Sequence, residues 1–413
     1  MHIPRPHAAI LALSAVVVVA AAPSGRAAWE FPRPPSFDPV QKPMVFGLAP
    51  GHDHDVDIVS GSQFNGLRTY ANLPYVNCFS DQDSGSSSKY DIAILGAPFD
   101  TGVTARPGAR YGPGGIRIGS QRKSAEFSWS VYTGRNPLLS WATVVDCGDV
   151  PLTWLDNNVA LAQLDKAHRV VSGRKASNES YSVTPRIVTL GGDHTTTLSA
   201  LRSTYQRWGP VSVIHFDSHI DTWDPAVLGG GISDYAGLNH GTFLHIAHEE
   251  GLIRNTSIHA GIRAPLYRRK GDLRHDARCG FSVVTARALD LDLLHGGGAS
   301  GIISQIRERV RGTRVYVSVD IDVLDPAFAP GTGTAEPGGW STRELLTVLD
   351  GLSGLDVVGA DVVEVAPAYD TRGETTVLAA AEVAFSLIEL MVENPVKSLA
   401  DEEEEEEEEA SGS

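Results

Sequence analysis

Short apolar runs alternate with amphipathic segments from residue 92 to residue 392. The runs are rich in Val and Ile and have the length of buried strands, whereas the segments between them repeat apolar residues with helical spacing. This alternation predicts an α/β fold with a parallel sheet and helices on both faces. In such sheets, ligands bind beyond the carboxyl ends of the strands. The predicted strands are Ile92–Gly96, Ile187–Leu190, Val211–Phe216, Ile258–Ile262, Val315–Val319 and Val357–Val363. The predicted helices are Val159–Val171, Thr196–Arg207, His240–Glu250, Ser300–Val310, Ser341–Leu352 and Thr376–Val392.

The amino-terminal residues do not follow this alternation. Residues Ala8 to Ala22 are apolar except for Ser14, follow Arg5, and lead to small residues ending at Ala28. A short positive region, an apolar run of this length and an Ala-x-Ala-like exit predict a secretory signal peptide over residues 1–28. The run is too short for a membrane-spanning helix. We expect a Pro-rich arm over residues 29–63 and a single domain over residues 64–396.

Charge narrows the range of partners. The 413 residues include 34 Lys and Arg against 50 Asp and Glu, which gives a formal net charge of −16. This balance argues against a nucleic acid bound through its phosphates. Nine consecutive acids, Asp401 to Glu409, supply part of the charge. Such a run is typical of a solvated tail, so residues 397–413 are predicted to be disordered.

The three cysteines, Cys78, Cys147 and Cys279, have no metal-ligand spacing. Their number fits one disulfide with a free thiol, or three buried thiols. Asn178-Glu-Ser and Asn255-Thr-Ser are acceptor sequons for N-glycosylation. With the signal sequence, these features lead us to expect a glycoprotein in the secretory pathway, extracellular or vacuolar, without stable membrane insertion once the signal is removed.

Histidines and aspartates cluster directly after three predicted strands. In an extended chain, side chains two residues apart point the same way, so four carboxylates and two imidazoles should converge. Carboxylates so close together are tolerable only if cations neutralise them. Six ligands suit two ions, and oxygen with imidazole but no thiolate suits Mn²⁺, with Zn²⁺, Co²⁺ or Fe²⁺ as alternatives. The candidate ligands are His194, Asp217, His219, Asp221, Asp320 and Asp322.

Three neighbouring residues have simpler interpretations. Asp193 is expected to cap the helix that begins near Thr195. Asp325 precedes Pro326 and is expected to shape a turn. His215 lies inside an apolar strand and is expected to be a core histidine or to support a metal ligand.

Three motifs together resemble the signatures of the ureohydrolases, the arginase/agmatinase family. They are Gly191-Gly-Asp-His194, Asp217-x-His-x-Asp221 and Ser318-x-Asp-x-Asp-x-x-Asp-Pro326, in the order and spacing of that family. The segments Gly96–Arg110, Gly112–Arg117, Asn239–Phe243 and His259–Arg263 resemble the agmatinase branch rather than arginases. The resemblance covers roughly residues 64–396 and implies a three-layer α/β/α domain with a central parallel sheet.

The resemblance also implies roles for the candidate site residues. His194, Asp217, Asp221 and Asp320 would hold one manganese ion, and Asp217, His219, Asp320 and Asp322 the other, so two manganese ions would bind per chain. A hydroxide between them would attack the guanidinium carbon, and Asp221 would accept the proton released. His240 would protonate the leaving amine, and Glu364 would pair with the guanidinium.

Substrate choice depends on the loop after the second motif, residues 222–239. This loop has no Arg or Lys and lacks the arginase pattern. A pocket without a cation disfavours a substrate carboxylate, which favours agmatine, giving putrescine and urea, over guanidinobutyrate or arginine. Trp223, Asp224 and Tyr235 are candidates for lining the pocket.

Other interpretations remain open at this stage. The same fold could serve another amidinohydrolase, a metal-dependent deacylase, or a secreted interaction module without catalysis. The complete ligand set, with His240 and Glu364, argues against the last of these. The family resemblance further implies a homo-oligomer, a trimer or a hexamer.

Overall fold

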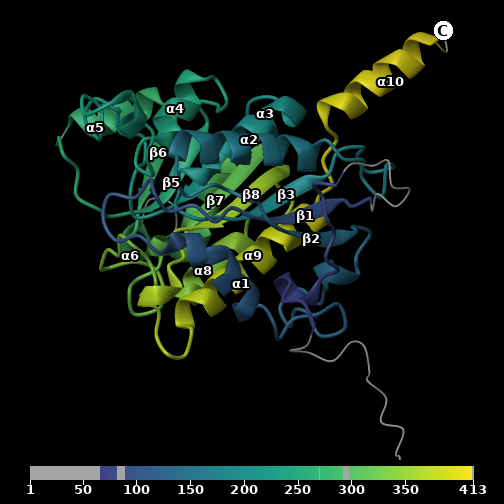
Figure 1. Ribbon diagram of the computed structural model, residues 1–413, viewed down its shortest axis with the longest axis horizontal. Helices are drawn as coiled ribbons and strands as arrows, with labels where there is room; N and C mark the ends of the chain where they lie inside the picture. Colours follow the sequence, from purple (N-terminus) through teal and green to yellow (C-terminus); the bar gives the residue numbers. More distant parts are fainter. Residues whose placement is uncertain (1–65, 81–88, 269, 292–296, 412–413) are drawn as a thin grey trace, which may run out of the picture. The chain divides into compact units, whose positions relative to one another are not determined.

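A computed structural model describes residues 66–80, 89–268, 270–291 and 297–411. The predicted signal peptide and Pro-rich arm lie outside the described residues. Within them, the chain forms one α/β/α unit around a parallel sheet (Figure 1).

The sheet has eight strands in the order β2-β1-β3-β8-β7-β4-β5-β6, and every pairing is parallel. All six predicted strands are present, and they form the six central positions. The two strands that were not predicted, β2 and β6, are the two edges. The bounds are β1 Ile92–Gly96, β2 Val144–Asp149, β3 Arg186–Leu190, β4 Ser212–Phe216, β5 Ser257–Ile262, β6 Phe281–Thr285, β7 Val315–Asp320 and β8 Val357–Val363.

Helices cover both faces of this sheet, as the alternating pattern predicted. Helices α2, α3 and α4 lie on one face, and α1, α8 and α9 lie on the other (Figure 1). The predicted helices correspond to α2 Asn157–Ser172, α3 Thr196–Trp208, α4 Phe243–Glu249, α7 Gly298–Arg309, α8 Thr342–Asp350 and α9 Thr375–Glu393. The structure adds α1 Gly112–Gly119, α5 Gly271–Arg278, α6 Ala288–Leu291 and α10 Leu399–Ser411.

Helix α9 is apolar because it belongs to the core. By length and composition alone it could cross a membrane, yet 67% of its most apolar window is buried within the protein. Its residues Val377, Val383 and Leu387 pack in the main apolar cluster beneath the sheet. The hydropathy of α9 therefore follows from packing against β8 and β3.

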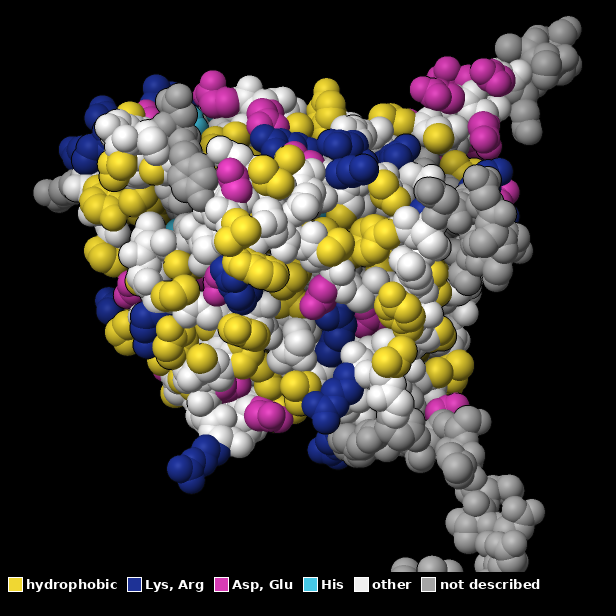
Figure 2. Space-filling model, in the orientation of Figure 1, with side chains coloured by type: hydrophobic (Ala, Val, Ile, Leu, Met, Phe, Trp, Pro, Cys, Tyr) yellow, Lys and Arg dark blue, Asp and Glu magenta, His cyan; other side chains and the backbone are white. Residues whose placement is uncertain are grey.

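The prediction of a disordered acidic tail is wrong for the described part of that segment, because residues 399–411 form α10. Asp401 lies in the first turn of this helix, and its carboxylate accepts the Ser398 amide at 2.6 Å and the Val183 amide at 2.8 Å. Glutamate favours helix formation, and acids near a helix N-terminus interact favourably with its dipole. Glu402 also pairs with Arg314. Residues Glu402 to Glu407 remain exposed, as the magenta side chains of Figure 2 show.

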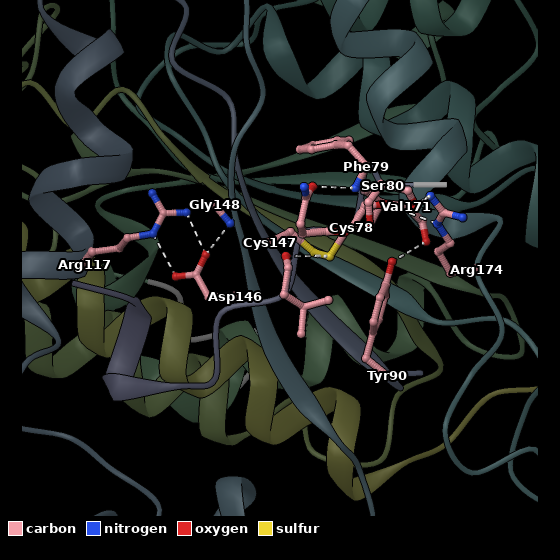
Figure 3. The surroundings of a disulfide bond; sticks show 12 residues. Cys78, Phe79, Ser80, Tyr90, Arg117, Asp146, Cys147, Gly148, Val171 and Arg174 are labelled. Atoms are coloured by element: carbon pink, nitrogen blue, oxygen red, sulfur yellow. Dashed lines mark hydrogen bonds and ion pairs between the residues drawn. A yellow bond between two sulfur atoms is a disulfide. The ribbon is translucent and has the colours of Figure 1, made fainter. Parts of the chain in front are cut away.

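Cys78 and Cys147 form a disulfide (Figure 3). Cys279 is a buried free thiol. The bond joins the segment before β1 to the edge strand β2. Next to it, Asp146 of β2 makes a two-pronged ion pair with Arg117 of α1, with N···O distances of 2.8 and 2.9 Å. The disulfide and this buried ion pair together fasten edge strand β2 to the body of the domain.

Candidate metal centre and adjoining cavity

The candidate ligands come from the carboxyl ends of adjacent strands. His194 follows β3, Asp217 follows β4, and Asp320 ends β7. These strands lie together in the order β3-β8-β7-β4, and Glu364 directly follows β8 between them. Because parallel strands end at the same edge, the fold brings together all six predicted ligands and Glu364.

The first half of the cluster surrounds His194. Its Nδ1 lies 3.1 Å from Asp217 Oδ2, 3.1 Å from Asp221 Oδ2 and 3.3 Å from Asp320 Oδ2. All four side chains are buried. One imidazole nitrogen thus faces three carboxylate oxygens.

The second half surrounds His219. Its Nδ1 lies 3.2 Å from Asp217 Oδ1 and 3.1 Å from Asp322 Oδ2. The two oxygens of Asp217 therefore face the two histidines separately, which is the arrangement of a carboxylate shared between two cations.

Hydrogen bonds fix the orientation of His194. The Ser318 hydroxyl donates to Asp361 Oδ1 at 2.7 Å, so its oxygen must accept the proton of His194 Nε2, 2.8 Å away. That tautomer leaves a lone pair on Nδ1, directed at the three carboxylates. Metal-binding histidines in proteins are commonly held in this way through their other nitrogen.

The electrostatics of the cluster fit bound cations. Burial and the charge of Asp217 raise the pKa of Asp221 to about 6. Burial and the charges of Asp322 and Asp217 raise the pKa of Asp320 well above its usual range. His194 Nδ1 and Asp217 Oδ2 are buried without a hydrogen-bond partner. Divalent cations would satisfy these atoms and offset the repulsion, and oxygen with imidazole donors suit such ions.

The backbone is strained at two site residues. Asp221 has φ 48° and Glu364 has φ 61°, in the left-handed region that residues other than glycine rarely occupy. Each such conformation costs on the order of 1–3 kcal/mol and persists only where its surroundings enforce it. The Glu364 amide donates to the Gly192 carbonyl at 2.8 Å, and the Asp221 carbonyl accepts from the Leu244 amide at 3.2 Å.

His240 and Glu364 lie beside the cluster as a hydrogen-bonded pair. His240 Nδ1 is 3.0 Å from Glu364 Oε1, which also accepts the His194 amide at 2.9 Å. His240 Nε2 is 2.8 Å from the Thr104 hydroxyl. Burial alone would lower the pKa of His240, but the hydrogen bond and charge of Glu364, with Asp221 and Asp193, raise it to about 9.

Asp325 and His215 behave as expected, whereas Asp193 does not cap α3 with its side chain. Thr195 is the N-cap residue of α3, which has no side-chain cap hydrogen bond. The Asp193 carboxylate instead accepts the Thr195 amide at 3.0 Å, in the turn before the helix, and the Gly102 amide. Asp325 accepts the Ala327 amide at 2.9 Å and holds a turn. His215 is buried in β4, and its Nε2 lies 3.1 Å from Asp217 Oδ2. It therefore supports the candidate ligand Asp217 from within the strand.

A cavity of about 290 Å³ opens beside the cluster. Its inner wall contains His219, Asp221, His240 and Asp320, so it reaches both halves of the cluster. Glu364 does not line the cavity, and it is hydrogen-bonded to His240, which does. The other lining residues are Thr104, Trp223, Leu228, Gly241, Ala264, Pro265, Leu266, Tyr267, Thr334 and Glu336.

The predicted lining residues are only partly those found. Trp223 lines the cavity, whereas Asp224 accepts the Ala226 amide in a turn outside it. The Tyr235 side chain lies outside the described residues. Sequence reasoning missed Thr104, Tyr267 and Glu336. Thr104 lies within a segment that resembled the agmatinase branch, but nothing in the pattern around Glu336 indicates a role.

Comparison with known proteins agrees with this geometry. The sequence profile of the arginase family matches residues 90–389. "Putative agmatinase 1" of Schizosaccharomyces pombe is 49% identical over 351 residues, covering 83% of this chain and 86% of that protein. The agmatinase of Neisseria meningitidis serogroup C is 37% identical over 307 residues, covering 73% and 88%. The solved structure of proclavaminate amidinohydrolase from Streptomyces clavuligerus has a TM-score of 0.68 and 33% identity, covering 80% of this chain and 99% of that one.

The chain therefore belongs to the arginase family. Within it, the chain falls in the agmatinase branch of metal-dependent amidinohydrolases, which confirms the fold and the class of enzyme predicted from the motifs.

Proposed function

We propose that this protein hydrolyses agmatine to putrescine and urea and holds two manganese ions per chain. The observation that carries the proposal is the cavity, which reaches both halves of the ligand cluster yet has no Lys or Arg among its described lining residues. A cationic substrate suits such a wall, and a substrate carboxylate would find no partner there.

The ligands divide into two sets that share Asp217. His194, Asp221 and Asp320 would complete one site around Asp217 Oδ2, and His219 and Asp322 the other around Asp217 Oδ1, with Asp320 shared as well. Carboxylates with imidazole and no thiolate favour Mn²⁺. Two such ions would lower the pKa of a water molecule in the cavity and would provide an electrophilic environment for the guanidinium.

The protein residues would move two protons. Asp221 lines the cavity and is placed to accept the proton from water as the water oxygen bonds to the guanidinium carbon. His240 would then return a proton through Nε2, directly or through the Thr104 hydroxyl, as the bond from carbon to the alkyl nitrogen breaks. The proton held by Asp221 replaces the one that His240 gives, and the remaining hydroxyl proton moves to the released amine, so water and the guanidinium become urea and an ammonium. Glu364 does not line the cavity, so it would act through His240, which it holds by its Nδ1.

A urea assay on a substrate panel tests this proposal. The chain from Trp29 onward, loaded with Mn²⁺, is given agmatine, arginine and 4-guanidinobutyrate. Urea chiefly from agmatine is the expected result. Urea chiefly from another member would overturn the substrate but keep the reaction, and no urea from any member would overturn both.

We propose that the protein acts in the secretory pathway, extracellular or vacuolar. The predicted signal peptide supports this, as does the Cys78–Cys147 disulfide, since such bonds persist in oxidising compartments. Asn178 is partly exposed and Asn255 is exposed, so both sequons could carry glycans. We expect the natively expressed protein to lose mass on glycosidase treatment. We also expect its mature N-terminus to lie near residue 29.

We also propose that the chain assembles into a trimer or a hexamer, which rests on the family resemblance alone. Light scattering of the purified protein would give the mass of the assembly, and the mass of a monomer would contradict it.

A further inference from the structure

Glu336 places a further carboxylate on the cavity wall, next to His219 but outside the set of candidate ligands. Its side chain is 31% exposed, and its Oε1 lies 3.9 Å from His219 Nε2. That separation is too long for a hydrogen bond. Among the described residues, the Glu336 carboxylate makes no hydrogen bond, so it remains available to a bound molecule.

The backbone that carries Glu336 is fixed relative to the ligands. Arg263, after β5, donates to the Glu336 carbonyl from Nε at 3.1 Å and from Nη2 at 2.8 Å. The same guanidinium donates to the Asp322 carbonyl at 2.6 Å. Arg263 therefore ties the loop of Glu336 to the loop of the candidate ligand Asp322. Its guanidinium donates these hydrogen bonds to carbonyls, and it interacts with the Glu336 carboxylate through charge rather than through a hydrogen bond.

The rest of the outer wall offers Glu336 no competing cation. Trp223, Leu228, Pro265 and Tyr267 give it an apolar and aromatic character, and no described Lys or Arg lines the cavity. The Trp223 and Tyr267 rings lie edge to face with centroids 5.7 Å apart. A cavity wall that carries both a carboxylate and aromatic rings is a favourable environment for an ammonium group.

We infer that Glu336 is the specificity-determining residue that binds a cationic group at the end of the substrate remote from the guanidinium. This inference rests on the proposed function and deepens it, because it defines the substrate class as guanidino compounds that end in an ammonium. Such a compound would span from the ligand cluster to Glu336, and one that ends in a carboxylate would be repelled there.

A different role for Glu336 would be to orient His219 and so to support the metal. The two roles differ in what they affect. A carboxylate that binds the remote ammonium matters only for substrates that carry this group, whereas a carboxylate that supports His219 matters for every substrate and for metal content.

The test compares agmatine with n-butylguanidine, which has the same chain length but no terminal charge, in Glu336→Gln. The readouts are kcat and KM for each substrate and bound manganese. The matched control is Glu249→Gln, which removes the same charge from an exposed position on α4 outside the cavity. We expect the ratio of kcat/KM for agmatine to that for n-butylguanidine to fall about 10- to 100-fold in Glu336→Gln, chiefly through KM. In Glu249→Gln the ratio should match wild type.

Two results would overturn the inference while leaving the proposed function intact. One is an unchanged ratio in Glu336→Gln. The other is an equal loss with both substrates together with loss of manganese, which would assign Glu336 to His219. A wild-type enzyme that releases urea from agmatine separates these results from failure of the proposed function. Glu336→Lys adds a converse test, since it should raise the preference for 4-guanidinobutyrate over agmatine.

Discussion

Asp217 is the residue that the two halves of the metal centre share. Its Oδ2 faces His194 and its Oδ1 faces His219. His215 approaches the same carboxylate from behind, so Asp217 is fully buried with polar groups on each side. Burial would raise the pKa of Asp217, but the surrounding histidines keep it well below its usual range. The side chain is therefore an anion ready to be shared by two cations.

Asp217→Ala should lose both manganese ions and the hydrolytic activity, because the change removes a donor from each half of the centre. Metal analysis after gel filtration measures the first effect and urea release the second. Asp290→Ala, an exposed acid on α6, should keep both. Retention of two metals by Asp217→Ala would contradict the shared arrangement.

His240 should affect turnover without affecting metal content, because it contacts Glu364 and Thr104 rather than a donor oxygen of the cluster. Loss of a positioned acid typically costs about 10²- to 10⁴-fold in rate. We expect His240→Ala to lower kcat within that range while two metals remain bound. Loss of metal in this variant would show that His240 is structural instead.

The pH profile gives a separate test of the same pair. Glu364 raises the pKa of His240, so removing the negative charge should lower that pKa. If protonated His240 is the acid, activity is lost as pH rises through its pKa. The alkaline limb of kcat for Glu364→Gln should therefore move to lower pH than in wild type. An alkaline limb that stays in place would exclude His240 as the group that titrates there.

At the scale of elements, sequence patterns predicted the strands that are buried on both sides and missed the strands at the edges. The central strands β3 and β7 are buried at every residue and read as apolar runs. Edge strand β6 has both buried and accessible positions, and β2 ends in Gly148 and an exposed Asp149. An edge strand has a neighbour on one side only, so its sequence carries a weaker signal.

The acidic tail shows a different limit of sequence reasoning. The amino-acid composition shows the charge of residues 401–409. It does not show the distant residues whose contacts stabilise a helix there. Asp401 bonds to Val183, 218 positions earlier in the chain, and Arg314 pairs with Glu402. The positive φ of Asp221 and Glu364 was equally beyond prediction, since tertiary contacts enforce it. The convergence of the six candidate ligands was predictable because strand ends and alternation are local features.

Removal of the disulfide should destabilise the domain without altering the centre. Cys78 and Cys147 close a loop with a sequence separation of 69 and anchor edge strand β2, which four strands separate from β4. The double variant Cys78→Ser/Cys147→Ser should lower the free energy of unfolding by about 2–4 kcal/mol. Urea denaturation followed by fluorescence measures this, and the double variant should still bind two metals. Cys279→Ala, which breaks no disulfide, is the control.

At the scale of the whole molecule, the centre is the point at which separate parts of the fold meet. Strands β3, β8, β7 and β4 each deliver site residues, and the chain between His194 and Glu364 includes most of the sheet. Ions bound there would connect segments that are far apart in sequence. Metal binding should therefore stabilise the entire domain and not only its active site.

That coupling predicts how stability depends on metal and pH together. Carboxylates hold the pKa values of His194 and His219 well above their usual range, and burial and the charge of Asp217 raise the pKa of Asp221 to about 6. Protons therefore compete with metal for the same atoms, and this competition weakens as pH rises. The increase in Tm on adding Mn²⁺ to chelator-treated protein should grow from pH 6 to pH 8, as followed by scanning calorimetry. Asp217→Ala should show little increase at any pH. An increase that shrinks with pH, or that survives in this variant, would mean that Mn²⁺ stabilises the protein elsewhere.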